Sequence, residues 1–318
     1  MRTPIAVLPF KRAFRIYWHI TDFCNQHCYY CPPLLNGGDI ANSPSAPTHE
    51  QLLKFVNTLP QILGSKELIV QFAGGEPTLH KSLPDIATKI KELVPNSFVG
   101  LTTNGTSPLD WWKNYSDLFK ATTISLHPQY LEKPSTLQRV LDNSLWMKEN
   151  SSTVLSFNLM TDPTRWDVVL HLYNTFSSHF GGRIIPKVLQ HLEVHESKSN
   201  YEYSEEQSLQ LSEWQRDNRF PESEHYSTAY LLLSDMQRED WSLAKWIREG
   251  WNQYKDWDCW SGQDSINVKI DGSVWNGVCR TYSLGHISDF SLKTSPVTCP
   301  VQYCACPTDL LVRKQKVT

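Results

Sequence analysis

The sequence predicts an α/β fold: a partial (β/α)6 TIM-like barrel with a small C-terminal cysteine-rich β-hairpin extension. Over the first 190 residues, strand-like apolar runs alternate with helix-like segments, as in a parallel sheet covered by helices. The unusual loops all follow strands, which is where parallel α/β folds and barrels place their functional sites. Eight cysteines divide into three near the N-terminus and five after residue 258, a segregation not expected of random surface thiols.

Each strand of the barrel is expected to be an apolar run that ends in a glycine-containing or polar loop. The first helix begins near Thr48, a plausible N-cap followed three residues later by Gln51, and continues through Leu52, Phe55 and Leu59. The remaining helices are expected over 83–93, 108–119, 135–149 and 164–180, and the strands over 14–20, 68–72, 98–102, 122–126, 154–160 and 183–189.

The chain after the barrel divides into two further parts, so the expected domains are 1–190, 191–257 and 258–318. Residues 191–225 are polar and predict a helical or mobile connection. Residues 226–250 predict an amphipathic bridging helix, whose apolar positions are Tyr230, Leu231, Leu233, Met236, Trp241, Leu243 and Trp246.

A β-hairpin is expected in the last part, formed by residues 265–270 and 273–278. The dipeptide Asp271-Gly272 between them supplies the positive φ angles of a tight turn. Folding of this hairpin brings Cys259, which precedes it, close to Cys279 at its end.

Composition excludes several function classes. The formal charge of −3 gives no basic excess, so a long nucleic acid is not an expected partner. No apolar run approaches the length of a membrane span, and the N-terminal apolar stretch is too short for a signal peptide. We therefore expect a cytoplasmic protein without membrane partners, whose cysteines are metal ligands rather than disulfides.

Three thiols, Cys24, Cys28 and Cys31, lie at spacing C-x3-C-x2-C directly after the first strand. Clustered thiolates select zinc or iron–sulfur clusters, and zinc normally takes two close pairs or a Cys/His quartet. A [4Fe–4S] cluster held by three cysteines has one iron without a protein ligand, which is free to bind a substrate or cofactor. A zinc knuckle or three unrelated thiols are the alternatives.

This triad resembles the signature of the radical S-adenosylmethionine (radical SAM) enzymes. The resemblance implies that the open iron chelates the amino and carboxylate groups of SAM. It also implies an electron donor such as flavodoxin or ferredoxin, whose electron cleaves SAM to a hydrogen-abstracting 5′-deoxyadenosyl radical. Tyr30 takes the aromatic position before the third cysteine, where the family often has a residue whose backbone meets the adenine.

Further positions resemble the family's cofactor site. Gly74, Gly75, Glu76 and Pro77 match its GGEP-type motif after the second strand. There, glycines permit close approach of the backbone to a ligand, and a carbonyl or carboxylate can accept a hydrogen bond from the SAM ammonium. The alternative interpretation of these residues is an ordinary glycine turn. The resemblance implies SAM or substrate contacts from later strand ends, at Thr102, Thr103, Asn104, Ser125, His127, Asn158, Met160, Leu189 and Gln190.

Some of these positions also have an ordinary structural interpretation. Asn104 precedes a glycine and so suits a turn. Ser125 and His127 lie two residues apart and therefore share one face of a strand. Asp22, Arg183 and Lys187 can help bind SAM or substrate but are more typical of solvated charges.

The C-terminal cysteines resemble the auxiliary-cluster extension called SPASM or, in its one-cluster form, twitch. Five thiols are too few for the seven of a two-cluster SPASM domain, so one auxiliary [4Fe–4S] cluster is expected. One thiol is then left over as a buried residue, a hydrogen-atom donor or a substrate ligand. Cys299 is the least certain ligand, although the spacing leaves Cys304 and Cys306 open as the extra thiol, and a structural zinc is the alternative cofactor. The candidates are Cys259, Cys279, Cys299, Cys304 and Cys306.

The sequence therefore predicts a radical SAM enzyme that abstracts hydrogen from a peptide or small molecule, with oxidation, cross-linking or epimerisation as the outcome. Modification of a nucleoside or nucleobase is an alternative. A non-catalytic iron–sulfur or zinc protein is another, and it has no need of the glycine loop.

Overall fold

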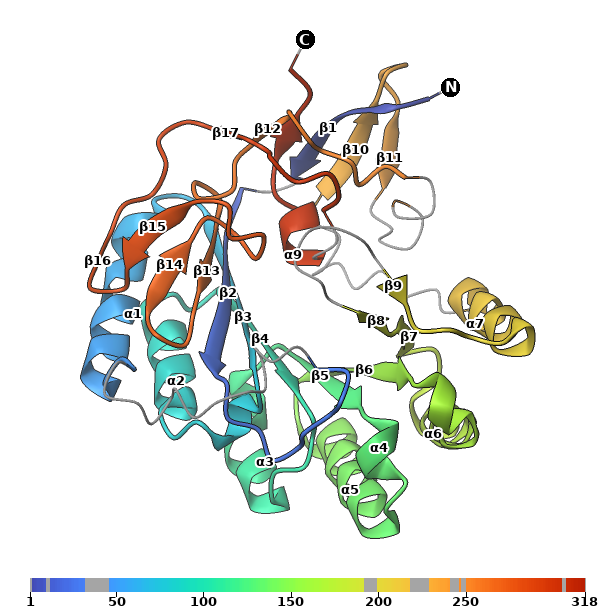
Figure 1. The fold of residues 1–318 in the computed structure, drawn as a ribbon. Helices are drawn as coiled ribbons and strands as arrows, with labels where there is room; N and C mark the ends of the chain where they lie inside the picture. The colour runs from blue at the N-terminus through green and yellow to red at the C-terminus, as the bar shows by residue number, and fades with distance from the viewer. Residues whose placement is uncertain are drawn as a thin grey trace.

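The computed structural model describes residues 2–9, 12–31, 46–191, 199–217, 229–240, 246, 250–304 and 307–317. Six parallel strands form the predicted partial barrel and follow one another in sequence order (Figure 1). They are β2 (Ala13–Thr21), β3 (Glu67–Gly74), β4 (Phe98–Thr103), β5 (Ala121–Leu126), β6 (Val154–Thr161) and β7 (Ile184–Val188).

Helices cover the outer face of this sheet, which confirms the predicted α/β fold (Figure 1). The first helix begins with the expected capping box: Gln51 N–H donates to Thr48 Oγ1 at 3.3 Å, and Thr48 N–H donates to Gln51 Oε1 at 2.8 Å. The helices are α1 (His49–Leu63), α2 (Leu83–Leu93), α3 (Leu109–Tyr115), the short α4 (Pro128–Leu131), α5 (Pro134–Asn150) and α6 (Trp166–Phe180).

Side chains alternate between the two faces of each barrel strand. On β2, Phe14, Ile16 and Trp18 are buried in the core beneath the helices, where Trp18 meets Phe55 of α1 at a ring-centroid distance of 5.2 Å. Full burial of each such side chain contributes roughly 1.5–3 kcal/mol. The intervening positions face the inside of the curved sheet, which we call the lumen.

The predicted C-terminal hairpin extends the barrel sheet. Its first strand, β13 (Ser265–Val268), pairs in parallel with β2, so that Val268 lies beside Trp18. Gly272 has φ +80°, as the Asp-Gly turn requires. Strands β14 (Ser273–Trp275), β15 (Ser283–His286) and β16 (Asp289–Phe290) continue the sheet in antiparallel order. The extension therefore lies directly beside the strand that leads to Cys24.

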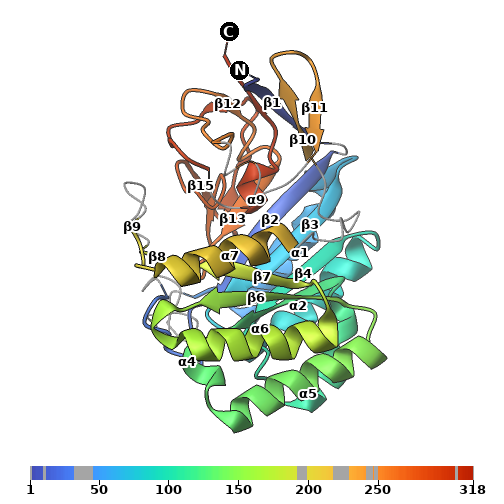
Figure 2. The same ribbon diagram turned by 90° about the vertical axis from the view of Figure 1, so that its right-hand side faces the viewer.

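A second sheet lies beyond the barrel and contains segments from both ends of the chain (Figure 2). Its N-terminal strand was not predicted, because its pairing partners are far away in the sequence. The strands, in spatial order, are β11 (Arg238–Asp240), β10 (Ala229–Leu233), β1 (Pro4–Pro9), β18 (Lys314–Gln315), β12 (Asp258–Cys259) and β17 (Val297–Thr298). The short helix α9 (Pro307–Leu310) precedes the last strand.

The predicted helix over 226–250 is wrong over residues 229–240, where β10 and β11 form a hairpin. Ala229, Leu231 and Leu233 are buried and the residues between them are only half-buried, which is the two-residue period of a strand. Met236, expected on the apolar helix face, is 69% exposed in the turn with φ +65°. Trp241 and Leu243 lie outside the described residues.

Among its described residues, the polar connection includes the helix α7 (Glu205–Asp217) and a two-residue strand pair, β8 (Gln190–His191) with β9 (Ser199–Asn200). Trp214 of α7 stacks on Tyr173 of α6 at 4.0 Å, which holds the connection against the barrel. None of the described helices combines the length and hydropathy needed to cross a bilayer.

Candidate functional site

The three N-terminal thiols line a cavity of about 190 Å³ at the carboxyl end of the barrel strands. The fold thus brings together Cys24, Cys28 and Cys31 with four other predicted features: the glycine turn, the end of β4, Ser125 and His127. The other lining residues are Tyr17, His19, Gln26, Ala73, Gly74, Gly75, Thr102, Thr103 and Asn104.

Burial keeps the triad thiols protonated near neutral pH in the absence of metal. It raises the pKa of Cys28 to about 12 and that of Cys31 to about 11. The pKa of Cys24 is also raised by burial, although the Gln26 N–H donates to its sulfur at 3.4 Å and the Asn104 amide lies 3.9 Å away. Since metal ligation requires thiolates, metal binding at this site releases protons.

The described residues contain no group of three His, Cys, Asp or Glu side chains placed to hold one metal ion. The three soft thiols at the cavity suit a multi-iron cluster.

The backbone of the glycine turn packs directly against the start of the cysteine loop. A Cβ at Gly74, whose φ is +144°, would lie 2.1 Å from the Thr21 carbonyl oxygen, and a Cβ at Gly75 would lie 2.3 Å from that of Phe23. Without side chains, Gly75 N–H donates to Thr21 O at 2.7 Å and Glu76 N–H donates to Phe23 O at 2.8 Å. The two glycines are thus required for the approach of two backbones.

The Glu76 carboxylate is fully buried and organises the ends of two strands. It accepts from the Thr78 N–H at 3.1 Å and hydroxyl at 2.6 Å, the Thr103 hydroxyl at 2.7 Å and the Asn104 N–H at 2.6 Å. Burial raises the pKa of Glu76, and these four hydrogen bonds act in the opposite direction. Both carboxylate oxygens are occupied, and neither Glu76 nor Pro77 lines the cavity. The residue positions the cavity wall.

An amide network then links the end of β4 to the cysteine loop. Asn104 donates from Nδ2 to Asn25 Oδ1 at 2.8 Å, and Asn25 donates from Nδ2 to Thr106 Oγ1 at 2.9 Å. Sequence reasoning missed Asn25. Its position inside the C-x3-C segment was the available signal.

His127 and Tyr30 hold the other side of the loop. His127 Nδ1 lies 2.9 Å from the Tyr30 hydroxyl and 3.4 Å from Cys28 Sγ, and the two rings stack at 5.9 Å. Burial lowers the pKa of His127 to about 4, so the imidazole is neutral at pH 7. The Tyr130 hydroxyl accepts from the His27 N–H and adds an anchor that the sequence did not reveal.

Three predicted contacts lie away from this cavity. Asn158 and Met160 sit on β6, and Leu189 donates its N–H to the Tyr203 hydroxyl at 3.0 Å. Gln190 begins β8. Asn158, Met160 and Leu189 do not line the cavity.

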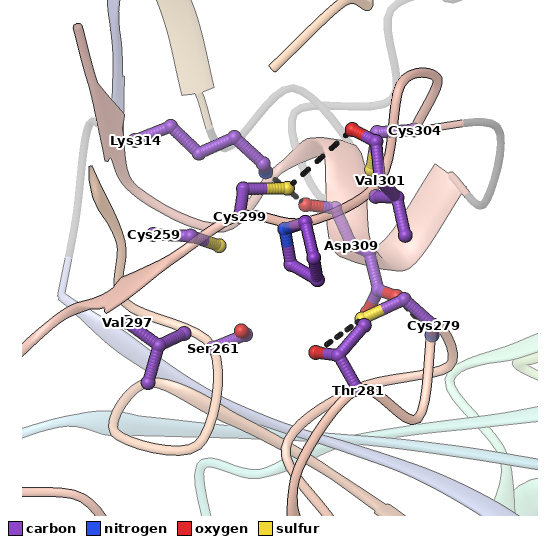
Figure 3. A pocket seen from close by; sticks show the side chains of 11 residues that line it. Cys259, Ser261, Cys279, Thr281, Val297, Cys299, Val301, Cys304, Asp309 and Lys314 are labelled. Carbon is purple, nitrogen blue, oxygen red and sulfur yellow. Dashed lines mark hydrogen bonds between the residues drawn. The ribbon is translucent and has the colours of Figure 1, made fainter. Parts of the chain in front are cut away.

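The C-terminal cysteines form a second thiol group. Cys259, Cys279, Cys299 and Cys304 surround one pocket, as Figure 3 shows, so the hairpin does bring Cys259 and Cys279 together. Cys306 lies outside the described residues. The backbone of each of these cysteines is held in place. In the second sheet, Cys259 pairs with Val297 and Lys314 of the neighbouring strands. The other three donate backbone hydrogen bonds: Cys279 N–H to Asp309 Oδ2 at 3.0 Å, Cys299 N–H to Trp257 O at 2.8 Å and Cys304 N–H to Asn252 O at 2.9 Å.

A buried lysine faces these thiols. Lys314 is 1% exposed and lines the same pocket (Figure 3). Its ammonium donates to the carbonyl oxygens of Asp309 and, at 3.1 Å, Val312, and it makes no ion pair with a carboxylate in the described part of the chain. Desolvation lowers the pKa of Lys314, but the nearby thiols and Asp309 raise it above its usual value. The Asp309 carboxylate in the same pocket attracts this buried cation, and a further anionic group would lower the cost of its burial.

The sequence comparisons identify one family. Residues 18–165 match the family model described as "Radical SAM superfamily". A GTP 3′,8-cyclase of Streptomyces coelicolor is 35% identical over 86 residues, which cover 27% of this chain and 24% of the relative. A GTP 3′,8-cyclase of Actinobacillus pleuropneumoniae is 34% identical over 92 residues, which again cover 27% of this chain and 24% of the relative. The chain thus spans about a quarter of the length of these curated relatives.

The solved structures share the fold over most of the chain. The structure described as anSMEcpe with bound AdoMet has a TM-score of 0.55 at 18% identity and covers 87% of this chain and 75% of its own. Streptococcus suis SuiB bound to precursor peptide SuiA has a TM-score of 0.56 at 12% identity, and the match covers 88% of this chain and 64% of the SuiB chain. At these identities the likeness establishes the architecture alone.

Proposed function

Because the chain belongs to the radical SAM superfamily, we propose that it is an enzyme that holds a [4Fe–4S] cluster on Cys24, Cys28 and Cys31 and binds SAM beside it. When bound, the cluster and SAM supply a 5′-deoxyadenosyl radical that abstracts hydrogen from the substrate. The observation that carries the proposal is the convergence of three thiols and a glycine turn on one cavity at the carboxyl end of the barrel.

The cavity also offers polar groups suited to SAM. Gln26 is 4% exposed and lines the cavity, and its Oε1 has no hydrogen-bond donor within the described residues. This orphaned acceptor suits the SAM ammonium or a ribose hydroxyl. Ser125 adds a hydroxyl, while Asn104 and His127 hold the loop that carries the thiols. Asn158, Met160, Leu189 and Gln190 are proposed to meet the ribose and adenine beyond the cavity.

We further propose one auxiliary [4Fe–4S] cluster on Cys259, Cys279, Cys299 and Cys304. The shared pocket and the buried Lys314 charge support this ligand set, which includes Cys299 and leaves Cys306 unassigned. The division into a barrel (1–190), a connection (191–257) and a cluster domain (258–318) remains part of the proposal. The pairing of β1 with β10 and β18 ties the first residues to the last part.

The proposed substrate is a peptide or small molecule, with a flavodoxin or ferredoxin as electron donor. The likeness to SuiB, whose structure holds a precursor peptide, covers 88% of this chain and supports a peptide. Similarity to GTP 3′,8-cyclases supports a nucleotide instead, but it covers only 27% of the chain.

The decisive experiment is anaerobic incubation of reconstituted protein with SAM and dithionite, assayed for 5′-deoxyadenosine. The wild type should form it and carry about eight irons per chain from two four-iron clusters. Replacing Cys24, Cys28 and Cys31 by Ala should abolish the product and leave about four irons. Lys54→Gln, on the exposed face of α1, is the control and should keep all the iron. Product formed by the triple variant would overturn the proposal.

A further inference from the structure

A lysine of the C-terminal hairpin reaches the lumen beside a histidine of β2, and the charge of an arginine acts on both. Lys269, one residue beyond β13, places its Nζ 3.1 Å from Nδ1 of His19, which lines the cavity. Arg280, which follows Cys279, lies close enough to act electrostatically on both His19 and Lys269. These groups come from β2, from the hairpin turn and from the loop after β14. The fold therefore brings together side chains that are far apart in the sequence.

Nothing in the described residues neutralises this pair by direct contact. Neither Lys269 nor Arg280 forms an ion pair there. Asp271 attracts Lys269 at longer range, but its carboxylate accepts from the Ser273 N–H at 3.0 Å and hydroxyl at 2.7 Å. Two like charges near each other and partly removed from water are destabilising. Arg280 also has φ +50°, an uncommon conformation that costs energy for a residue with a side chain.

His19 completes the group as a hydrogen-bond donor. Burial, then the charges of Lys269 and Arg280, lower its pKa to about 3, so the ring is neutral. Because Nδ1 accepts from the Lys269 ammonium, the proton resides on Nε2. His19 thus brings an N–H rather than an acceptor to the site.

The surrounding lumen carries little negative charge. Along β2–β7, the alternate positions that face the lumen contain Arg15, His19 and Lys187. The one acidic residue among them is Glu67, which is exposed at the first position of β3, at the opposite end from the cavity. Burial lowers the pKa of Lys187.

We propose that Lys269, Arg280 and His19 form a subsite for an oxyanion of the substrate, a phosphate or carboxylate group held in the lumen. An oxyanion relieves the repulsion between the two cations and accepts charge-assisted hydrogen bonds from both, the guanidinium in a bidentate manner. The inference rests on the proposed function, since it names the class of substrate for that same site.

The test uses the full-length reconstituted protein saturated with SAM and measures equilibrium binding of two probes, inorganic pyrophosphate and glutarate. At least one probe should bind the wild type. Lys269→Gln and Arg280→Gln should each weaken that binding about tenfold or more, because each removes a hydrogen bond to a charged group. Lys54→Gln, on the exposed face of α1, is the matched control and should bind like the wild type.

The comparison of the probes distinguishes the two sources of the oxyanion. Tighter pyrophosphate binding indicates a phosphorylated substrate, and tighter glutarate binding indicates a carboxylate. The inference is overturned if neither probe binds the wild type, or if both variants bind as well as the wild type. It is also overturned if SAM affinity falls by the same factor, since the cations would then serve the SAM carboxylate. Failure of the proposed function would show separately, as wild-type protein that forms no 5′-deoxyadenosine.

Discussion

Lys314 allows a sharp test of the proposed auxiliary cluster. Replacing it by Met keeps a long, unbranched side chain in the pocket but removes the positive charge that faces Cys259, Cys299 and Cys304. The loss of a buried cation makes it harder to add an electron to an adjacent cluster. The reduction potential of that cluster should therefore become more negative.

The size of the shift follows from Coulomb's law. Two unit charges interact by about 4 kcal/mol at 4 Å with an effective dielectric constant of 20, and by about half as much at twice that distance. Since a tenfold change in a one-electron equilibrium corresponds to about 59 mV, an interaction of about 2 kcal/mol corresponds to about 90 mV. We thus expect Lys314→Met to lower the potential by roughly that amount.

The assay is a redox titration of the reconstituted protein followed by electron paramagnetic resonance. The cluster on Cys24, Cys28 and Cys31 provides an internal reference, and Lys316→Met, at an exposed position on the same terminal segment, is the matched control. Unfolding of the metal-free protein gives a second measurement. In the metal-free protein, Lys314→Met should lower the free energy of unfolding by no more than about 2 kcal/mol. The loss of two hydrogen bonds is offset because a charge no longer has to be buried. An unchanged potential in a variant with full iron content would refute the reasoning.

Three further predictions concern the first site. Glu76→Gln should lower the free energy of unfolding by about 1–3 kcal/mol in urea titrations, because an amide cannot accept all four hydrogen bonds; an unchanged midpoint would contradict the positioning role. Gly75→Ala should reduce iron loading of the first cluster, since its Cβ would meet the Phe23 carbonyl oxygen at 2.3 Å, whereas Gly182→Ala, with nothing within 4 Å, should load normally. The folded-state pKa of His19 is lowered to about 3, so its contribution to stability is present above its unfolded pKa of about 6.5 and is lost as the pH falls towards 3. The free energy of unfolding should therefore fall with decreasing pH in this range, by up to about 1.4 kcal/mol per pH unit. His19→Gln should flatten this dependence, as measured by urea titrations across the range.

Local signals in the sequence were enough to predict the barrel. Apolar runs of five to nine residues, each followed by a glycine or polar loop, located all six parallel strands, and Thr48 with Gln51 fixed the start of α1. The cysteine triad and the glycine turn were predicted to meet because the carboxyl ends of parallel strands share one edge. The cavity confirms that they do.

The failures all involve contacts between distant parts of the chain. The strand β10 was taken for a helix because Leu231 and its neighbours are apolar at both helical and strand spacing, and its partner β1 lies more than 200 residues away. Glu76 was expected to face SAM, but its partners Thr103 and Asn104 come from the next strand. Lys314, four residues from the end, carried no signal until the fold placed it among four thiols.

The parallel pairing of β13 with β2 connects the two thiol groups. β2 runs towards Cys24 at its carboxyl end, and β13 runs alongside it from the region of Cys259. Since β14 returns in the opposite direction, Cys279 comes back to the end where β13 began. The triad and the C-terminal thiols therefore lie at opposite ends of one rigid strand pair, with the lumen between them. A substrate in the lumen would lie between the two proposed clusters, whose separation the sheet fixes, and His19, Lys269 and Arg280 are the residues that we propose to select it.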